Sequence, residues 1–253
     1  MTDSRPIALI TGGARRVGAA IGQEFARRGF DLIITYRTSA DQAQAMAQRL
    51  GQSHGTRVRT VRCDLADPDA AARACANAAS DAGRLDVLVH NASAYFPTPF
   101  DMPLPWETVR DLYAINAASP LLISAALAPL LTRSPLEGGG CVVAMGDMHA
   151  MGRPRVGFSA YGMSKAALIE LVRVLARELA PNARAVGIAP GVVAWPESGY
   201  ESDEASQQAY LNRVPLRRTG TPHDAARLAA ALALDMPYVT GEVVRLDGGR
   251  WLA

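Results

Sequence analysis

The sequence has few cysteines and no cysteine pattern typical of a disulfide framework or a zinc site. The three cysteines, Cys63, Cys75 and Cys141, are widely spaced, with no C-x-x-C pair and no Cys/His cluster. Isolated cysteines are typical of buried thiols in a reducing compartment. We therefore expect a cytoplasmic protein without a metal site or a disulfide.

Long apolar runs and concentrated positive charge are also missing. No run of about 18 uninterrupted apolar residues is present, and Met1–Pro6 is polar rather than a basic region leading into a long apolar one. The sequence thus predicts neither a membrane span nor a signal peptide. The net charge is only +2 without a basic block, which argues against nucleic acid as the main partner.

The sequence does contain an alternation of short apolar segments and longer alanine-rich segments. The predicted strands are Ile7–Thr11, Leu32–Tyr36, Arg57–Cys63, Val87–Asn91, Cys141–Met145, Arg184–Ala189 and Glu242–Leu246. The predicted helices are Arg16–Arg28, Ala40–Leu50, Pro68–Ala79, Trp106–Asn116, Pro120–Leu131, Ser159–Leu179 and Asp224–Leu234.

This alternation predicts parallel βαβ units, and the near-continuous apolar strands predict a sheet that is covered on both faces. Right-handed crossovers then give one α/β domain over residues 1–253, a doubly wound Rossmann fold with a parallel sheet of about seven strands flanked by helices. Residues 191–221 contain several prolines and polar residues, and we expect a substrate loop there.

A glycine-rich segment, Thr11–Gly18, lies between the first predicted strand and the first predicted helix. Glycines there let the backbone turn tightly and approach a pyrophosphate, while the helix N-terminus offers free N–H groups. A glycine-rich turn alone is a weak signal, but this position predicts a dinucleotide site that includes Gly12, Arg16 and Val17.

The end of the second predicted strand selects between NAD and NADP. An NAD site usually carries an acidic residue there, whereas this sequence has Tyr36-Arg37-Thr38-Ser39. A guanidinium pairs with phosphate oxygens in bidentate fashion, and Arg16 lies in the neighbouring turn. We therefore predict NADPH as the cofactor. The alternative is that both arginines are solvated surface charges.

Tyr161 and Lys165 stand four residues apart at the start of a long predicted helix, so they share one helix face. An ammonium near a phenol favours the phenolate, and we expect Lys165 to lower the Tyr161 pKa and make this tyrosine an acid–base group. An exposed helix turn is the alternative for such a pair, but the preceding dinucleotide turn favours an active centre.

Taken in order, these motifs resemble those of the short-chain dehydrogenase/reductase family over nearly the whole chain. The matching pieces are Thr11–Gly18, Asp64-Leu65, Asn91-Ala92, Asn116, Tyr161 with Lys165, and Pro190-Gly191. The cofactor contacts that the resemblance implies are Asp64 and Leu65 at the adenine, Asn91 and Ala92 along the cofactor, Pro190 and Gly191 near the nicotinamide, and Lys165 on its ribose. Asn116 would support a proton relay to Lys165.

Two departures resemble the pteridine reductase branch of that family. Arg16 replaces the usual middle glycine of the turn, and Asp147 stands where the family usually has its active-site serine. The segments Asn91–Pro99 and Pro190–Glu197 also resemble that branch. The resemblance implies that Tyr95 stacks on a pterin; the alternative is a core aromatic at a strand end. Ser93 is a candidate to bond the pterin edge or a cofactor phosphate. Trp195 either covers the site or anchors its loop.

The chemistry of the reaction fits the exchange of serine for aspartate. A ketone reductase needs hydrogen-bond donors to the carbonyl oxygen, whereas reduction of a ring C=N bond adds hydride to carbon and a proton to nitrogen. An acid bonded to Tyr161 can relay that proton, so we expect Asp147 to be catalytic. The alternative is a turn residue that caps backbone N–H groups.

The sequence therefore predicts an NADPH-dependent reductase of a pterin or folate-like small molecule, acting through Tyr161, Asp147, Lys165 and Asn116. A carbonyl or 3-oxoacyl reductase of the same fold is the runner-up, and a catalytically silent NADP(H)-binding sensor is the third hypothesis. The resemblance implies a homotetramer or homodimer.

Overall fold

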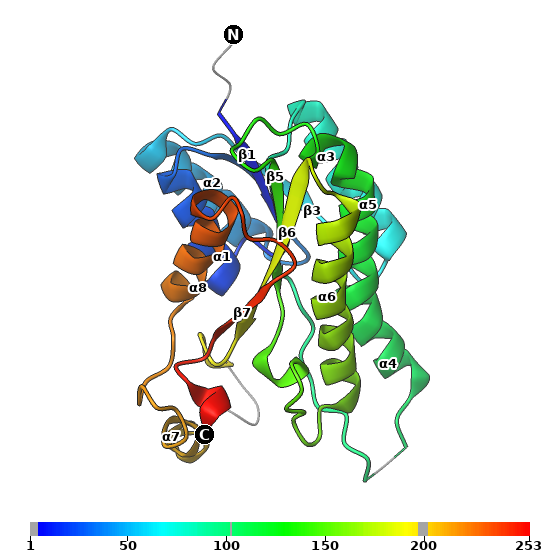
Figure 1. Cartoon of the computed structure of the whole chain (residues 1–253), viewed down its shortest axis with the longest axis vertical. Helices are drawn as coiled ribbons and strands as arrows, with labels where there is room; N and C mark the ends of the chain where they lie inside the picture. The colour runs from blue at the N-terminus through cyan, green and yellow to red at the C-terminus, as the bar shows by residue number, and fades with distance from the viewer. Residues whose placement is uncertain (1–4, 102, 197–201) are drawn as a thin grey trace.

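Seven parallel strands form one sheet at the centre of the molecule (Figure 1). In the computed structural model, which describes residues 5–101, 103–196 and 202–253, they are β1 (Ile7–Ile10), β2 (Asp31–Tyr36), β3 (Val58–Arg62), β4 (Val87–His90), β5 (Gly140–Met145), β6 (Ala183–Pro190) and β7 (Val243–Leu246). Their order is β3-β2-β1-β4-β5-β6-β7, which confirms the predicted doubly wound Rossmann fold.

Helices cover both faces of this sheet (Figure 1). One layer contains α1 (Arg16–Arg27), α2 (Ala40–His54) and α8 (Pro222–Ala230), and the other contains α3 (Pro68–Ala82), α5 (Ser119–Leu131) and α6 (Ser159–Glu178). Successive side chains of β1 point to opposite faces of the sheet. Ala8 and Ile10 pack in the core beneath the first helix layer, and Ile7 and Leu9 pack in the core beneath the second. All three cysteines are buried and free, as expected.

Two helical regions differ from the sequence prediction. Helix α4 (Trp106–Tyr113) runs through a π-helical segment, Ala114–Ala118, into α5, so two predicted helices form one continuous stretch. The expected substrate loop contains helix α7 (Glu204–Leu211), whose N-terminus is capped by the Asp203 side chain. This helix is short and weakly amphipathic, and polar residues dominate it, which explains why periodicity did not reveal it.

The stretch Trp106–Leu131 is long and apolar enough to cross a membrane by length and composition alone. In the structure, Ile123, Leu127 and Leu131 of α5 are completely buried in the core against the sheet. A core helix passes the same test, so this stretch is weak evidence for a membrane span.

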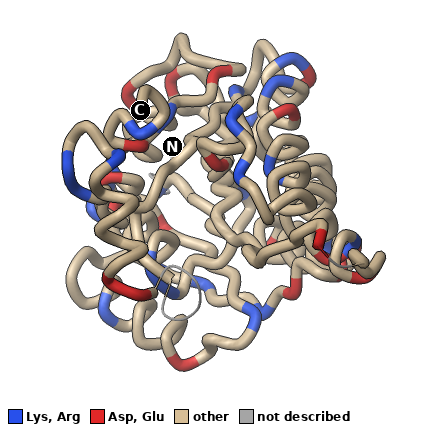
Figure 2. The backbone as a smooth tube through the Cα atoms, turned by 90° about the horizontal axis from the view of Figure 1, so that it is seen from below, with Lys and Arg blue, Asp and Glu red and all other residues tan. Residues whose placement is uncertain are grey.

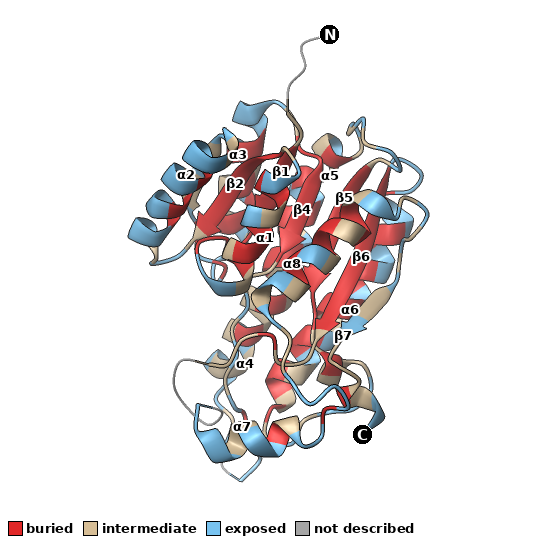
Figure 3. Ribbon diagram, turned by 90° about the vertical axis from the view of Figure 1, so that its left-hand side faces the viewer, coloured by how far each residue is buried: buried red, intermediate tan, exposed pale blue. Residues whose placement is uncertain are grey.

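Charged residues of both signs are interspersed over the molecule. Viewed from the carboxyl ends of the strands, Lys and Arg positions lie on several separate segments among Asp and Glu positions (Figure 2). Many are paired on the surface, as Arg28 is with Asp235. Helix α7 and the chain's C-terminus lie beyond this end of the sheet (Figure 3), which is where ligands of open α/β sheets bind.

A buried histidine at the end of β4 makes stability depend on pH. The side chain of His90 is 2% exposed, its Nε2 lies 2.8 Å from Ser124 Oγ, and burial lowers its pKa to about 3 from a usual 6.5. At a pH between about 3 and 6.5, the unfolded chain binds a proton on His90 that the folded protein does not bind. The free energy of unfolding therefore decreases by about 1.4 kcal/mol for each unit that the pH falls below 6.5.

We expect the free energy of unfolding to lose about 2 kcal/mol through His90 between pH 7.5 and pH 5.0. A His90→Gln variant lacks this loss, and urea denaturation at both pH values measures the difference. The matched control is His223→Gln, which changes an exposed histidine. Equal pH dependence in wild type and His90→Gln would contradict the prediction.

Candidate active site

The turn between β1 and α1 requires glycine at two positions. Gly12 has a φ of +62°, and a Cβ there would lie 2.9 Å from the Ala92 Cβ. A Cβ on Gly18 would lie 2.2 Å from the Gly12 carbonyl oxygen, so the first turn of α1 packs directly on the loop. The first amides of a helix have no intrahelical acceptor, and Arg16, Val17 and Gly18 line a cavity. This arrangement fits a dinucleotide pyrophosphate.

Asn91 fixes the same turn from the end of β4. Its Nδ2 donates to the carbonyl oxygens of Thr11 (2.9 Å) and Gly12 (3.2 Å), and its backbone N–H donates to Thr11 Oγ1 (3.0 Å). Asn91, Ala92 and Ser93 all line the cavity. Asn91 thus shapes the turn with its side chain in addition to bordering the expected path of the cofactor.

Arg16 faces the loop that follows β6. It adopts a φ of +49°, in the left-handed region that favours glycine. Its Nη2 donates to the backbone oxygens of Ala194 (3.1 Å) and Trp195 (2.7 Å). The guanidinium therefore links the glycine-rich turn to the expected substrate loop, and its role toward a 2′-phosphate stays a prediction.

The residues expected to bind the adenosine half lie at the ends of β2 and β3. In Tyr36–Ser39, Arg37 and Thr38 are exposed, while Asp64 is exposed and Leu65 is buried. Because β2 and β3 are neighbours in the sheet, both segments lie along one part of the carboxyl edge. The selection of NADP by Arg37 stays a prediction.

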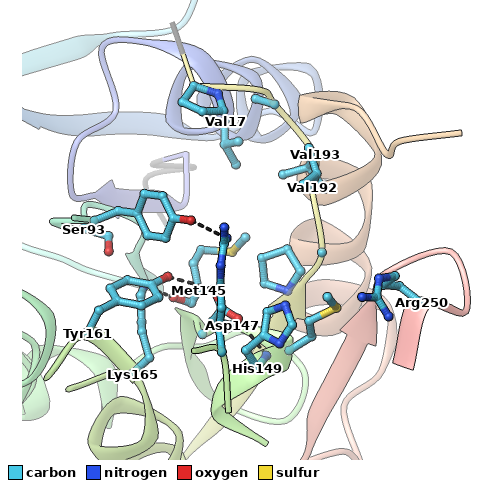
Figure 4. Close-up of a pocket in the computed structure, with 18 of the residues that line it drawn as sticks. Val17, Ser93, Met145, Asp147, His149, Tyr161, Lys165, Val192, Val193 and Arg250 are labelled. Atoms are coloured by element: carbon cyan, nitrogen blue, oxygen red, sulfur yellow. Dashed lines mark hydrogen bonds between the residues drawn. The ribbon is translucent and has the colours of Figure 1, made fainter. Parts of the chain in front are cut away.

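Asp147, Tyr161 and Lys165 come together at the carboxyl end of β5 (Figure 4). The Tyr161 hydroxyl donates to Asp147 Oδ2 (2.8 Å), and Asp147 Oδ1 accepts from the backbone N–H of His149 (2.7 Å). Lys165 Nζ donates to the Met145 carbonyl oxygen (2.7 Å). Asp147 therefore caps its turn with one oxygen and contacts Tyr161 with the other, and its role as a proton relay stays a prediction.

Burial changes the acid–base properties of this group. The pKa of Tyr161 lies well above its usual value because of burial and, next, the Asp147 carboxylate. Burial lowers the pKa of Lys165 to about 8, and the Asp147 carboxylate partly opposes this shift. The expectation that Lys165 lowers the Tyr161 pKa is wrong in this structure, because desolvation and Asp147 dominate and the lysine bonds a backbone carbonyl.

Asn116 holds a loop, and no hydrogen bond joins it to Lys165 within the described residues. It is completely buried in the π-helical segment, where its Nδ2 donates to Ala94 O (2.9 Å) and Ser164 Oγ (3.0 Å). Its Oδ1 accepts from the Ser93 hydroxyl (3.0 Å) and the Ala94 N–H (2.9 Å). Asn116 therefore positions the segment that carries Ser93 and Tyr95, and its expected role in a proton relay to Lys165 stays a prediction.

Tyr95 belongs to an aromatic wall of the cavity. Its ring stacks on Phe158 with centroids 5.0 Å apart and meets Tyr161 edge to face at 4.9 Å. The Arg155 guanidinium lies 4.2 Å from the Phe158 centroid. No sequence motif indicated Phe158, which pairs with Thr98 in a parallel β-bridge just ahead of α6. Of these three rings, Tyr95 and Tyr161 line the cavity, while Phe158 packs behind Tyr95.

The segment after β6 closes the other side of the cavity. Pro190 and Gly191 line it, and a Cβ on Gly191 would lie 2.6 Å from Tyr210 Oη. Trp195 packs edge to face on Tyr210 at 5.5 Å and is not among the residues that line the cavity. The structure therefore favours loop anchoring over substrate binding for Trp195. The Glu197 end of the Pro190–Glu197 motif lies outside the described residues.

These elements enclose a cavity of about 820 Å³, a volume typical of small-molecule sites. Tyr161 and Lys165 lie on one side and Arg250 on the other, with Asp147 and His149 between them (Figure 4). Tyr210, Arg213 and Arg250 are lining residues that no sequence motif indicated. No group of three or more His, Cys, Asp or Glu residues within the described part of the chain is arranged to hold a metal.

Comparison with curated proteins gives relatives that match this chain over most of their own length. An uncharacterized oxidoreductase of Mycobacterium tuberculosis (strain CDC 1551 / Oshkosh) is 35% identical, covering 96% of this chain and 91% of that protein. The 7alpha-hydroxysteroid dehydrogenase of Escherichia coli (strain K12) is 32% identical, covering 96% and 92%. Pteridine reductase 1 of Leishmania tarentolae is 29% identical, covering 98% and 97%.

A family model and a solved structure agree with these relatives. The model described as enoyl-(acyl carrier protein) reductase matches residues 12–250. A short-chain dehydrogenase from Burkholderia cenocepacia J2315, solved in complex with NADP, superposes with a TM-score of 0.87 at 32% identity and 97% coverage of both chains. By its fold, its ordered motifs and these matches, the chain belongs to the short-chain dehydrogenase/reductase family.

Proposed function

We propose that this oxidoreductase uses NADPH to reduce a ring C=N bond of a pterin, converting a dihydropterin to a tetrahydropterin. The observation that carries the proposal is the 2.8 Å contact between the Tyr161 hydroxyl and the Asp147 carboxylate at the wall of the cavity. Similarity to pteridine reductase 1 supports it, and the aromatic wall at Tyr95 suits a flat heteroaromatic ring.

The residues present fit NADPH. The Gly12–Gly18 turn leaves space for a pyrophosphate at the N-terminus of α1, and the solved structure in complex with NADP has the same fold. When bound, the nicotinamide supplies the hydride. Arg37 and Arg16 would hold the 2′-phosphate, and Lys165 would bond the ribose, since its amine remains largely protonated below a pKa of about 8.

The high pKa of Tyr161 makes a free phenolate unfavourable, so this residue is best used as a bridge for a proton. A protonated Asp147 would give its proton to the Tyr161 oxygen while the Tyr161 proton passes to the ring nitrogen. Tyr161 then stays neutral and Asp147 ends as a carboxylate. The step needs the same Tyr161–Asp147 contact with the direction of donation reversed.

The same pair would also serve a carbonyl substrate. Hydride addition to C=O or to C=N leaves negative charge on the heteroatom, which takes a proton from Tyr161 in either case. This rival is supported by the relative that is a 7alpha-hydroxysteroid dehydrogenase, so ketone substrates belong in the test.

We further propose a cytoplasmic homo-oligomer. Trp106, Leu121 and Met163 are exposed apolar residues on the neighbouring helices α4, α5 and α6. A subunit interface along these helices would cover such exposed apolar side chains. The free, buried thiols fit a reducing compartment.

The test follows NADPH oxidation with dihydrobiopterin, dihydromonapterin, dihydrofolate, a 3-oxoacyl thioester and a ketosteroid. We expect turnover of the dihydropterins and preference for NADPH over NADH. Turnover of the thioester or the ketosteroid alone would overturn the pterin proposal. Tight NADPH binding without turnover of any substrate would favour the sensor. Equal or better use of NADH would refute the roles of Arg16 and Arg37.

A further inference from the structure

Arg250 is a buried cation at the side of the cavity opposite Tyr161 (Figure 4). It follows β7, where Asp247 accepts hydrogen bonds from the N–H groups of Gly249 and Trp251, both at 2.9 Å, and turns the chain. Gly249 has a φ of +84° in this turn. The turn brings Arg250 from the end of the sequence into the wall of the site.

The guanidinium of Arg250 is incompletely paired. The residue is 6% exposed, its Nη1 donates to the Ala253 backbone oxygen (3.1 Å), and its buried Nε has no hydrogen-bond partner in residues 5–101, 103–196 and 202–253. Its Cζ lies 5.8 Å from the Tyr210 ring centroid. A buried donor without an acceptor costs free energy, which an incoming acceptor recovers.

The charge around Arg250 is positive. Burial, Arg213 and Arg153 lower its pKa, while Tyr210 and Asp247 oppose the shift only in part. Asp247 already accepts two backbone hydrogen bonds, as described above. Arg153 donates through Nη1 to the Trp251 backbone oxygen (2.8 Å) and so supports the turn, not the cavity.

Arg213 brings a second guanidinium to the same cavity. It is exposed at the end of α7, and its Nε donates to the Ala209 carbonyl oxygen (3.2 Å). No hydrogen bond within the described part of the chain involves its Nη groups. Two guanidinium groups on one wall are the arrangement that binds a carboxylate or a phosphate.

We propose that Arg250 and Arg213 bind an anionic group on the substrate's side chain, while its ring lies at the Tyr95–Tyr161 wall. This inference rests on the proposed function and narrows it: the preferred substrate is a dihydropterin whose ring substituent carries a carboxylate or a phosphate. A dihydropterin with an uncharged substituent leaves Arg250 unpaired and binds more weakly.

The test measures binding to protein loaded with NADP⁺, so that no hydride transfer is required. The probes are dihydrofolate for carboxylate, a phosphorylated dihydroneopterin for phosphate, and dihydrobiopterin as the uncharged reference. We expect at least one anionic probe to bind more tightly than dihydrobiopterin. Arg250→Met should weaken its binding by about 10- to 100-fold and leave that of dihydrobiopterin within about twofold.

Arg213→Met changes an exposed residue and keeps the inference testable if Arg250→Met fails to fold. This variant should also weaken the binding of the anionic probe while leaving the binding of dihydrobiopterin unchanged. The matched control is Arg217→Met, which removes the same charge from the same segment outside the cavity wall. The preference for carboxylate or for phosphate identifies the anion.

Equal binding of anionic and uncharged probes, or an effect of Arg217→Met as large as that of Arg213→Met, would overturn the inference even if pterins are reduced. If the wild-type protein reduces no pterin but the arginine variants still lose binding of an anionic probe selectively, the anion site is upheld and the proposed reaction is rejected.

Discussion

Asp147→Asn is expected to lower kcat for dihydropterin reduction by about 10²- to 10⁴-fold, the usual contribution of a general acid. The asparagine keeps an oxygen that accepts from the His149 N–H, so the turn is retained. It cannot donate a carboxyl proton toward Tyr161. The change therefore separates the relay role of Asp147 from its capping role.

Steady-state kinetics measures the loss of kcat, and titration with NADPH measures whether cofactor binding is retained. The dissociation constant of NADPH should stay close to that of wild type, because Asp147 contacts Tyr161 and His149 rather than the glycine-rich turn. Asp147→Ser should also lose pterin reduction. Full activity in either variant would dismiss Asp147 as the relay acid.

A double variant sharpens the result. If Tyr161 and Asp147 act as one relay, Tyr161→Phe with Asp147→Asn should be about as slow as Tyr161→Phe alone, because residues that act as a unit are strongly non-additive. Independent roles would make the two losses multiply. This comparison distinguishes a shared proton path from two separate electrostatic effects.

Arg184→Met is expected to lower the free energy of unfolding by about 3–5 kcal/mol. Arg184 is 5% exposed at the start of β6, and its guanidinium donates to five backbone carbonyl oxygens. The acceptors are Gly138, Leu232, Ala233, Met236 and Val239. Methionine fills the space of the stem but leaves these carbonyls without this donor.

Urea denaturation at a fixed protein concentration checks this prediction. Arg184→Lys should recover only part of the loss, because one ammonium cannot reach carbonyls that surround a planar guanidinium. The control Arg173→Met removes an exposed arginine that pairs with Glu170 three residues earlier and should change stability by about 0.5 kcal/mol or less. A comparable change in Arg184→Met and Arg173→Met would contradict the role of Arg184.

Sequence patterns were sufficient for the features that a few consecutive residues encode. Apolar strands alternating with helices predicted the doubly wound sheet, and the strand positions agree within a residue or so at each end. The glycines of Thr11–Gly18 and the four-residue spacing of Tyr161 and Lys165 are equally local. Each depends on backbone geometry that neighbouring residues set by themselves.

Only the tertiary structure decided how distant residues share the site. Asp147 meets Tyr161, Arg16 meets the loop at Ala194, and Arg250 reaches the cavity because packed elements bring together segments far apart in the sequence. The same packing buries Tyr161 and raises its pKa, against the sequence expectation. Desolvation depends on the whole surroundings of a group, so no local motif specifies it.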